Sequence, residues 1–194
     1  MIDCAGKFLI APPRMQDWRF QKTVLYMWKH DVTGTNGVII NKPVRHPTFQ
    51  DICRQGNLER SKGHNPQIYY GGPVMDNLVG VLHTLDVRMA TTHIPTPGRG
   101  LGYTLDKLMI EHIAQGKVRP KKFRLCLGIS SWEVGQLEAE LESAPPRDPN
   151  SSWLVLNFDQ SLCFTDLKED DMWEKCVNLA ISQKTKSFIK NYFD

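Results

Sequence analysis

Residues 127–141 read Leu-Gly-Ile-Ser-Ser-Trp-Glu-Val-Gly-Gln-Leu-Glu-Ala-Glu-Leu, and they mark the passage from a strand into a helix. The segment from Phe123 to Ile129 alternates as a half-buried strand does. Ser130 and Glu133 have the spacing of a capping box, which predicts a helix from there to about Glu142. The apolar residues expected to turn this helix toward the core are Val134, Leu137 and Leu141.

Outward from this segment, short runs of strand-forming residues recur on both sides. They predict strands at residues 7–11, 24–28, 38–40, 68–70, 78–83, 153–158 and 162–164. Caps and apolar periodicity predict further helices at residues 48–53, 104–116 and 170–181. Strands and helices are mixed without regular βαβ alternation. The predicted fold class is therefore α+β rather than a doubly wound sheet.

The composition is that of an ordinary globular chain and excludes a disordered tail, a collagen and a disulfide knot. There are 194 residues with 41% in the apolar set and a formal net charge of +3. We expect one domain over residues 1–181 and a C-terminal extension over 182–194. The five cysteines form no C-x-x-C pair, which favours reduced thiols in the cytoplasm. Neither a signal-peptide core nor an apolar run of about 18 residues is present, so no membrane span is expected.

Two segments are candidates for binding. Gly71-Gly72-Pro73 follows a predicted strand, and its amides could form an anion-binding nest or simply a tight turn that needs glycine. The second segment spans residues 128–140, where polar and aromatic groups near a helix N-terminus could line a ligand groove. A capped helix with a solvated acidic face is the alternative. The groups in question are Ser130, Trp132, Gln136 and Glu138.

His83 shares one side of its predicted strand with Val79 and Val81. This pattern favours a core or rim histidine with one hydrogen bond. A general-base role would need a nucleophile within hydrogen-bond reach. The six histidines show no H-x-x-H spacing, so neither a metal nor a cofactor is expected.

The strongest basic segment places five cations within eight residues, as in a solvated turn or in a weak, salt-sensitive contact to nucleic acid. These cations are Lys117, Arg119, Lys121, Lys122 and Arg124. The tail mixes lysines with four apolar residues at i, i+1, i+4 and i+5, which share one face of a helix. Such a face packs on its own domain, on a partner or on a second copy. The four residues are Phe188, Ile189, Tyr192 and Phe193.

Several segments, in order along the chain, resemble the AlgH/YqgE family. The most distinctive has the form G-x-x-x-W-x-x-G-Q-L-E-x-E. The resemblance covers residues 6–181 and implies an α+β fold whose bent, mostly antiparallel sheet forms a pseudo-barrel with flanking helices. It implies no established reaction, and members have been named as regulators of transcription. The segments are Gly6–Pro13, Trp28–Val44, Gly71–Val74, Val81–His83, Leu127–Leu141, Trp153–Leu154, Leu162–Phe164 and the helix around Trp173.

Because no complete catalytic set is present, the sequence predicts a non-enzymatic regulatory or adaptor protein that binds a protein partner. Its surface would combine the Gly71–Val74 loop, the 128–140 segment and the tail. Two alternatives stay open. One is a small-molecule or nucleotide-binding enzyme in which the loop holds an anion and His83 acts beside a serine or Cys126. The other is a weak nucleic-acid binder that uses residues 117–124.

Overall fold

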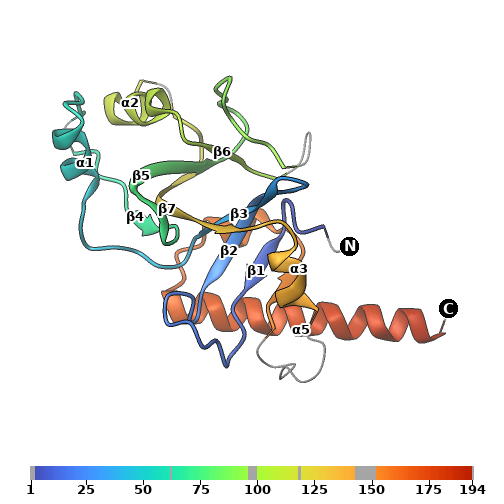
Figure 1. The fold of residues 1–194 in the computed structure, drawn as a ribbon. Helices are drawn as coiled ribbons and strands as arrows, with labels where there is room; N and C mark the ends of the chain where they lie inside the picture. The colour runs from blue at the N-terminus through green and yellow to red at the C-terminus, as the bar shows by residue number, and fades with distance from the viewer. Residues whose placement is uncertain (1–2, 62, 96–99, 118, 143–151, 194) are drawn as a thin grey trace.

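The computed structural model describes residues 3–61, 63–95, 100–117, 119–142 and 152–193 (Figure 1). In this part of the chain, eight strands form one open sheet in the order β6-β5-β7-β3-β2-β1-β8, and β4 joins it by pairing with β7. The strands are β1 (Phe8–Ile10), β2 (Val24–Asp31), β3 (Gly34–Ile39), β4 (Ile68–Tyr70), β5 (Val74–His83), β6 (Gly102–Thr104), β7 (Phe123–Trp132) and β8 (Leu154–Leu156). The helices are α1 (Phe49–Gln55), α2 (Lys107–Gln115), α3 (Gln136–Leu141), α4 (Gln160–Cys163) and α5 (Glu169–Phe193).

The long strand β7 joins two halves of the sheet. Its N-terminal part pairs with β5 and, in parallel, with β4, whereas Ser130–Trp132 pairs with β3. The other pairings between named strands are antiparallel. The predicted α+β class with a mostly antiparallel sheet and flanking helices is therefore confirmed, and the sheet is not closed.

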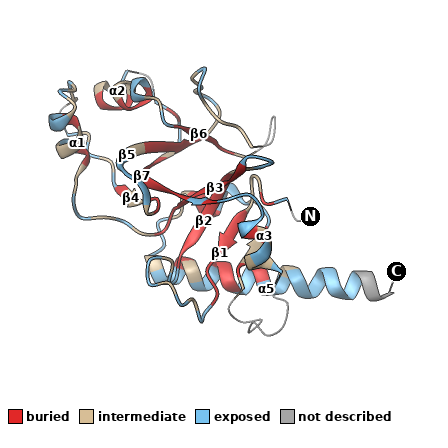
Figure 2. Ribbon diagram, viewed as in Figure 1, coloured by how far each residue is buried: buried red, intermediate tan, exposed pale blue. Residues whose placement is uncertain are grey.

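The helices cover different parts of this sheet (Figure 2), and together with it they form three clusters of buried side chains. Met109 and Ile113 of α2 pack with Leu125 of β7 and with α1. Residues of α4 and α5 pack against β1, β2 and β3. On the other face of those strands, Leu137 of α3 packs with Trp132 and the apolar side chains that β1 and β2 turn toward it.

Arg124 of β7 ties the two halves of the sheet to α4. Its guanidinium donates to the carbonyl oxygens of Ile40, Cys163 and Thr165 and lies 4.1 Å from the ring centroid of Tyr69. The side chain is buried. Carbonyl dipoles and an aromatic face thus replace the water that the charge loses on folding. The prediction that Arg124 belongs to a surface basic patch is wrong, because its donors are used inside the fold.

The helix predicted from Ser130 begins later than its sequence signal indicates. Residues Ser130, Ser131 and Trp132 continue β7 because they pair with Gly37, Asn36 and Thr35 of β3, and α3 begins only at Gln136. The predicted capping box is wrong: the Ser130 hydroxyl donates to the Gly71 carbonyl oxygen at 3.1 Å. Val134 is exposed instead of facing the core.

Three other elements differ from their sequence predictions. The helix α2 begins at Lys107 with Asp106 as its cap, because Thr104 pairs with Val81 in the sheet. The predicted strand at residues 162–164 is a short helix, α4, which Asp159 caps. The last helix does not end near residue 181, since α5 continues to Phe193 without interruption. None of the described helices is both long enough and apolar enough to cross a membrane.

Candidate functional site

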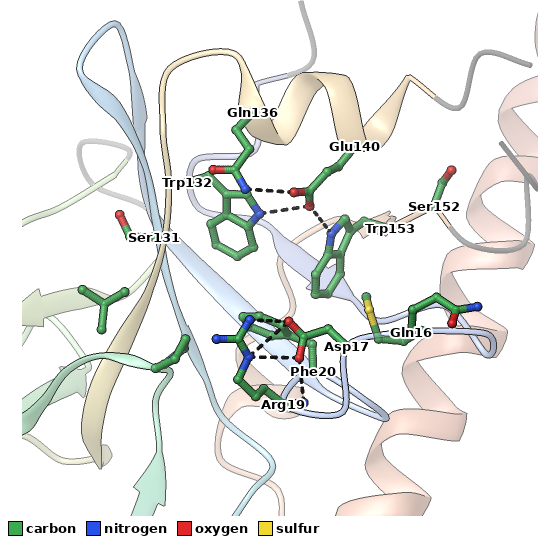
Figure 3. Close-up of a pocket in the computed structure, with 13 residues that line it drawn as sticks. Gln16, Asp17, Arg19, Phe20, Ser131, Trp132, Gln136, Glu140, Ser152 and Trp153 are labelled. Atoms are coloured by element: carbon green, nitrogen blue, oxygen red, sulfur yellow. Dashed lines mark hydrogen bonds and ion pairs between the residues drawn. The ribbon is translucent and has the colours of Figure 1, made fainter. Parts of the chain in front are cut away.

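A cleft of about 620 Å³ opens between four segments that are far apart in the sequence (Figure 3). The loop at residues 15–20 forms one side of the cleft, and Pro73 and Val74 border it. The end of β7 and the helix α3 form the opposite side, and Ser152 and Trp153 close one end. Sheet pairing brings these segments together, because β7 carries Trp132 beside β3 while the Gly71–Val74 loop packs on the same strand.

Three aromatic rings form the apolar part of the cleft. The ring centroids of Phe20 and Trp132 lie 6.2 Å apart, those of Phe20 and Trp153 lie 5.7 Å apart, and those of the two indoles lie 6.0 Å apart. The indoles are buried over most of their surface. Trp153 meets the other two rings edge to face, and Phe20 and Trp132 are tilted by 33°. These contacts hold the rings in one arrangement, so the apolar part of the cleft is preformed.

The carboxylate of Glu140 accepts hydrogen bonds from both indoles of the cleft and so fixes their relative position. Its Oε2 accepts from the indole N–H of Trp132 at 3.1 Å and from that of Trp153 at 2.8 Å. Its Oε1 accepts from the Gln136 amide at 3.0 Å. A single carboxylate therefore accepts three side-chain donors, two of them on nearly buried rings. This network gives the cleft a rigid polar edge.

Asp17 and Arg19 form an ion pair on the opposite side of the cleft. The guanidinium donates to the carboxylate through Nε at 3.0 Å and Nη2 at 2.6 Å, and it lies 5.9 Å from the centroid of the Phe20 ring. The hydrogen bond from Arg19 lowers the pKa of the Asp17 carboxyl below its usual value. Nη1 takes no part in this pair, so it retains donors for a ligand carboxylate or carbonyl.

The Gly71–Val74 loop is a close-packed turn. The Gly71 amide donates to Leu127 at 2.7 Å, and its carbonyl accepts from the amide of Ile39 at 2.9 Å. A Cβ at Gly72 would lie 2.3 Å from backbone atoms of Ile129, so only glycine allows this approach. The Gly71 amide is therefore not available to bind an anion, which argues against the anion-binding nest. Pro73 and Val74 border the cleft.

His83 lies at the other end of β5 from this loop. It pairs with Phe123, whereas Val74 pairs with Ile129, which corresponds to about 20 Å along β7. Burial lowers the pKa of its imidazole. Nδ1 contacts the Thr84 carbonyl at 2.9 Å and Nε2 contacts the Thr104 hydroxyl at 2.9 Å. His83 is thus a core histidine, as its strand pattern favours, and it does not share a pocket with the loop.

Two of the candidate nucleophiles, Ser130 and Cys126, are also inside the fold. The third, Ser131, is exposed at the cleft, at the opposite end of β7 from Phe123, which pairs with His83. Ser130 is buried and donates to the Gly71 carbonyl. Cys126 is fully buried, and burial raises the pKa of its thiol to about 12. Neither faces His83 in the sheet register, since His83 pairs with Phe123. The geometry therefore does not assemble the set that the enzyme alternative requires.

Glu138 points away from the cleft and links α3 to β2. Its Oε1 lies 2.9 Å from Nε2 of His30, whose Nδ1 accepts from the backbone N–H of Cys4 at 3.1 Å. Because Nδ1 is an acceptor, Nε2 carries the proton and donates to the carboxylate. This hydrogen bond lowers the pKa of Glu138. Of the four groups predicted on residues 128–140, only Trp132 and Gln136 line the cleft.

The remaining basic side chains lie on another part of the surface. Lys117, Arg119, Lys121 and Lys122 are exposed in the segment between α2 and β7. They are absent from the lining of the cleft. Among the described residues, no cluster of three or more histidine, cysteine, aspartate or glutamate side chains could hold a metal ion.

Sequence reasoning missed Phe20, Glu140, Trp153 and the Asp17–Arg19 pair. The only local signal for the loop is its two aromatic residues beside a D-x-R sequence in Met15–Phe20. Glu140 is one of four glutamates in the 133–142 segment, and their spacing alone does not indicate which one faces the indoles.

Comparisons with known proteins agree with this architecture. The family model described as AlgH-like matches residues 8–184. A UPF0301 protein of Paraburkholderia phymatum is 33% identical over 181 residues, which cover 92% of this chain and 88% of the relative. One of Caulobacter vibrioides is 31% identical over 178 residues, or 91% of this chain and 87% of the relative.

Solved structures give the same result. The solution structure of the AlgH protein from Pseudomonas aeruginosa is 28% identical and superposes with a TM-score of 0.70, covering 93% of this chain and 92% of that one. A crystal structure of a Corynebacterium diphtheriae protein, 23% identical with a TM-score of 0.64, shares the fold over 90% of this chain and 86% of that one. The chain belongs to the AlgH-like family.

Proposed function

We propose that this protein is a non-enzymatic adaptor whose cleft binds a segment of a protein partner. The observation that supports the proposal is the convergence of the Gly71–Val74 loop and the α3 motif on one cleft with aromatic rings and fixed polar groups. Aromatic rings with nearby hydrogen-bonding groups suit an extended peptide, whose apolar side chains and backbone amides need both. Regulation of transcription, which the family resemblance implies, would then be exerted through that partner.

We place this interaction in the cytoplasm, since all five cysteines are buried thiols. The single domain proposed for residues 1–181 contains the whole cleft, and the tail lies outside it.

A cleft-blocking variant tests the proposal. Ser131 is exposed at the cleft, so Ser131→Arg fills it without removing a core side chain. Lys121→Ala on the distant basic segment is the matched control. Tagged wild-type protein and both variants are used for pull-down from native lysate with nuclease, followed by mass spectrometry. We expect a stoichiometric protein that wild type and Lys121→Ala retain and Ser131→Arg loses. Equal retention by all three proteins would refute the proposal.

Weak nucleic-acid binding is the second candidate, because four exposed cations lie within six residues. Four phosphate contacts predict a slope of log K against log salt of about −3 to −4. A fluorescence titration of a labelled DNA duplex at several salt concentrations measures it. A flat salt response, or binding that Lys121→Ala and Lys122→Ala leave unchanged, would exclude this candidate.

A further inference from the structure

The helix α5 carries opposite charges on its two ends and extends beyond the sheet (Figures 1 and 2). Residues 184–190 of this helix are all exposed, as pale blue shows in Figure 2. The acidic end contains Glu169, Asp170, Asp171 and Glu174, and the basic end contains Lys184, Lys186 and Lys190.

One face of this helix is a continuous stripe. Residues spaced by three or four lie above one another on a helix. The stripe begins at the acidic end, passes through an apolar middle and reaches the basic end. Ile181 is 52% exposed and Phe188 is 70% exposed. An apolar groove of about 470 Å³ that Pro12, Pro13 and Leu154 help to line runs beside it. The members of the stripe are Glu174, Val177, Ile181, Lys184 and Phe188.

We propose that this stripe is a dimerisation surface, on which the α5 helices of two copies of this chain pair antiparallel about a two-fold axis near residue 179. The positions of the stripe residues along the chain determine which residues of the two helices face each other. The pair Glu174 and Lys184 and the pair Val177 and Ile181 share the midpoint 179. One arrangement therefore places Glu174 opposite the partner's Lys184, twice. It also brings the exposed Ile181 of each copy to the groove of the other copy, where Val177, only 8% exposed, is part of the lining.

Charge selects this direction of pairing. A parallel pair would place Glu174 against Glu174 and Lys184 against Lys184, and like charges at such positions destabilise. Antiparallel helices also align their dipoles favourably. In the described part of the chain, no carboxylate lies within ion-pair distance of Lys184, Lys186 or Lys190. Asp170 already pairs with Lys22 at 2.8 Å, which leaves Glu174 as the matching acid on the stripe.

Self-association through the edges of the sheet is the competing mode, and hydrogen bonds within the chain already occupy these edges. The amide of Gln183 bridges the outer edge of β8, accepting from the N–H of Asn157 at 2.9 Å and donating to Val155 at 3.2 Å. At the other end of the sheet, His93 exchanges backbone hydrogen bonds with Tyr103 of β6 at 2.8 and 2.9 Å. Edge pairing between copies would have to break these bonds, whereas helix pairing on the stripe keeps them.

Sedimentation equilibrium of the full chain at low salt tests the proposal. We expect a dimer whose dissociation constant rises at least tenfold in Ile181→Asp. Ser187→Asp is the matched control. It adds the same charge about 120° around the helix from Ile181 and should leave the dimer intact. Because Ile181 and Ser187 are exposed, both variants should keep the wild-type circular dichroism spectrum.

A charge exchange tests the antiparallel register itself. Lys184→Glu places two carboxylates opposite each other at both ends of the pair, and we expect its dissociation constant to rise about tenfold. Adding Glu174→Lys in the same chain restores the opposite charges and should recover wild-type affinity. A monomer at all concentrations up to about 100 μM, at which even a dimer with a micromolar dissociation constant would be populated, would overturn the proposal. So would a dimer that Ile181→Asp leaves unchanged, or a loss in Lys184→Glu that Glu174→Lys does not recover.

Discussion

Replacing Glu140 by alanine should destabilise the protein through the two indoles that its carboxylate holds. Three hydrogen bonds converge on this group, from Trp132, Trp153 and Gln136. A polar group left without its partner costs about 1–3 kcal/mol. Gln136 is exposed and finds water, but the two indole N–H groups are on nearly buried rings. The open cleft lets water replace part of each bond, so we take about 1.5 kcal/mol for each indole, or about 3 kcal/mol in all.

This loss of unfolding free energy can be converted into an expected shift of the melting temperature. An unfolding entropy of about 2.1 cal/mol/K per residue gives about 0.4 kcal/mol/K for a chain of 194 residues. A loss of about 3 kcal/mol therefore lowers the melting temperature by about 7 °C. Differential scanning calorimetry measures the shift, and tryptophan fluorescence reports on the two indoles.

A matched control separates the hydrogen bonds from the lost charge. Glu142 is an exposed glutamate at the end of the same helix. Glu142→Ala removes the same charge and should change the melting temperature by about 1 °C at most, as ordinary surface substitutions do. If Glu140→Ala melted within about 2 °C of wild type, the idea that this carboxylate organises the cleft would be wrong.

Three further predictions concern the frame around the cleft. Arg124→Met should lower the free energy of unfolding in urea by more than about 3 kcal/mol, because two buried carbonyl acceptors and one part-buried acceptor lose their donor. A loss under about 1 kcal/mol would contradict the structural role of Arg124. Gly72→Ala should lower the free energy of unfolding by several kcal/mol, because the added Cβ overlaps β7. Gly63→Ala is the control: no atom lies within 4 Å of the added Cβ, so only the positive φ should lower the free energy of unfolding, by about 1 kcal/mol. Equal melting temperatures for the two variants would refute this prediction. Burial lowers the pKa of His83 in the fold, so below about pH 6.5 the unfolded chain binds a proton that the folded chain does not, and stability should fall as pH drops from 7.5 to 5. Urea unfolding across this range should show a smaller fall in His83→Gln than in wild type, and an identical pH dependence would exclude His83 as a source.

The sequence correctly predicts features that depend on neighbours along the chain. Thr48 caps α1 at the start of the helix predicted from residue 48, and Gly116 ends α2 where the helix predicted over 104–116 ends. The alternation before Ile129 predicts β7, and the pattern of His83 predicts its burial. Caps, periodicity and strand alternation are set by contacts within a few residues, which a single sequence contains.

Features that depend on distant partners were decided by the tertiary structure. Ser130 has the spacing of a helix cap but lies in β7, because pairing with β3 satisfies more backbone groups than a cap would. Arg124 has the appearance of a surface cation but is buried, because carbonyls from two other segments surround it. In the same way, the cleft exists only where sheet pairing places Phe20, Trp132 and Trp153 together, and of these three residues the sequence indicated only Trp132. The sequence by itself determined most of the local elements and the family resemblance. Only the packing of segments more than a hundred residues apart decided which side chains form the site.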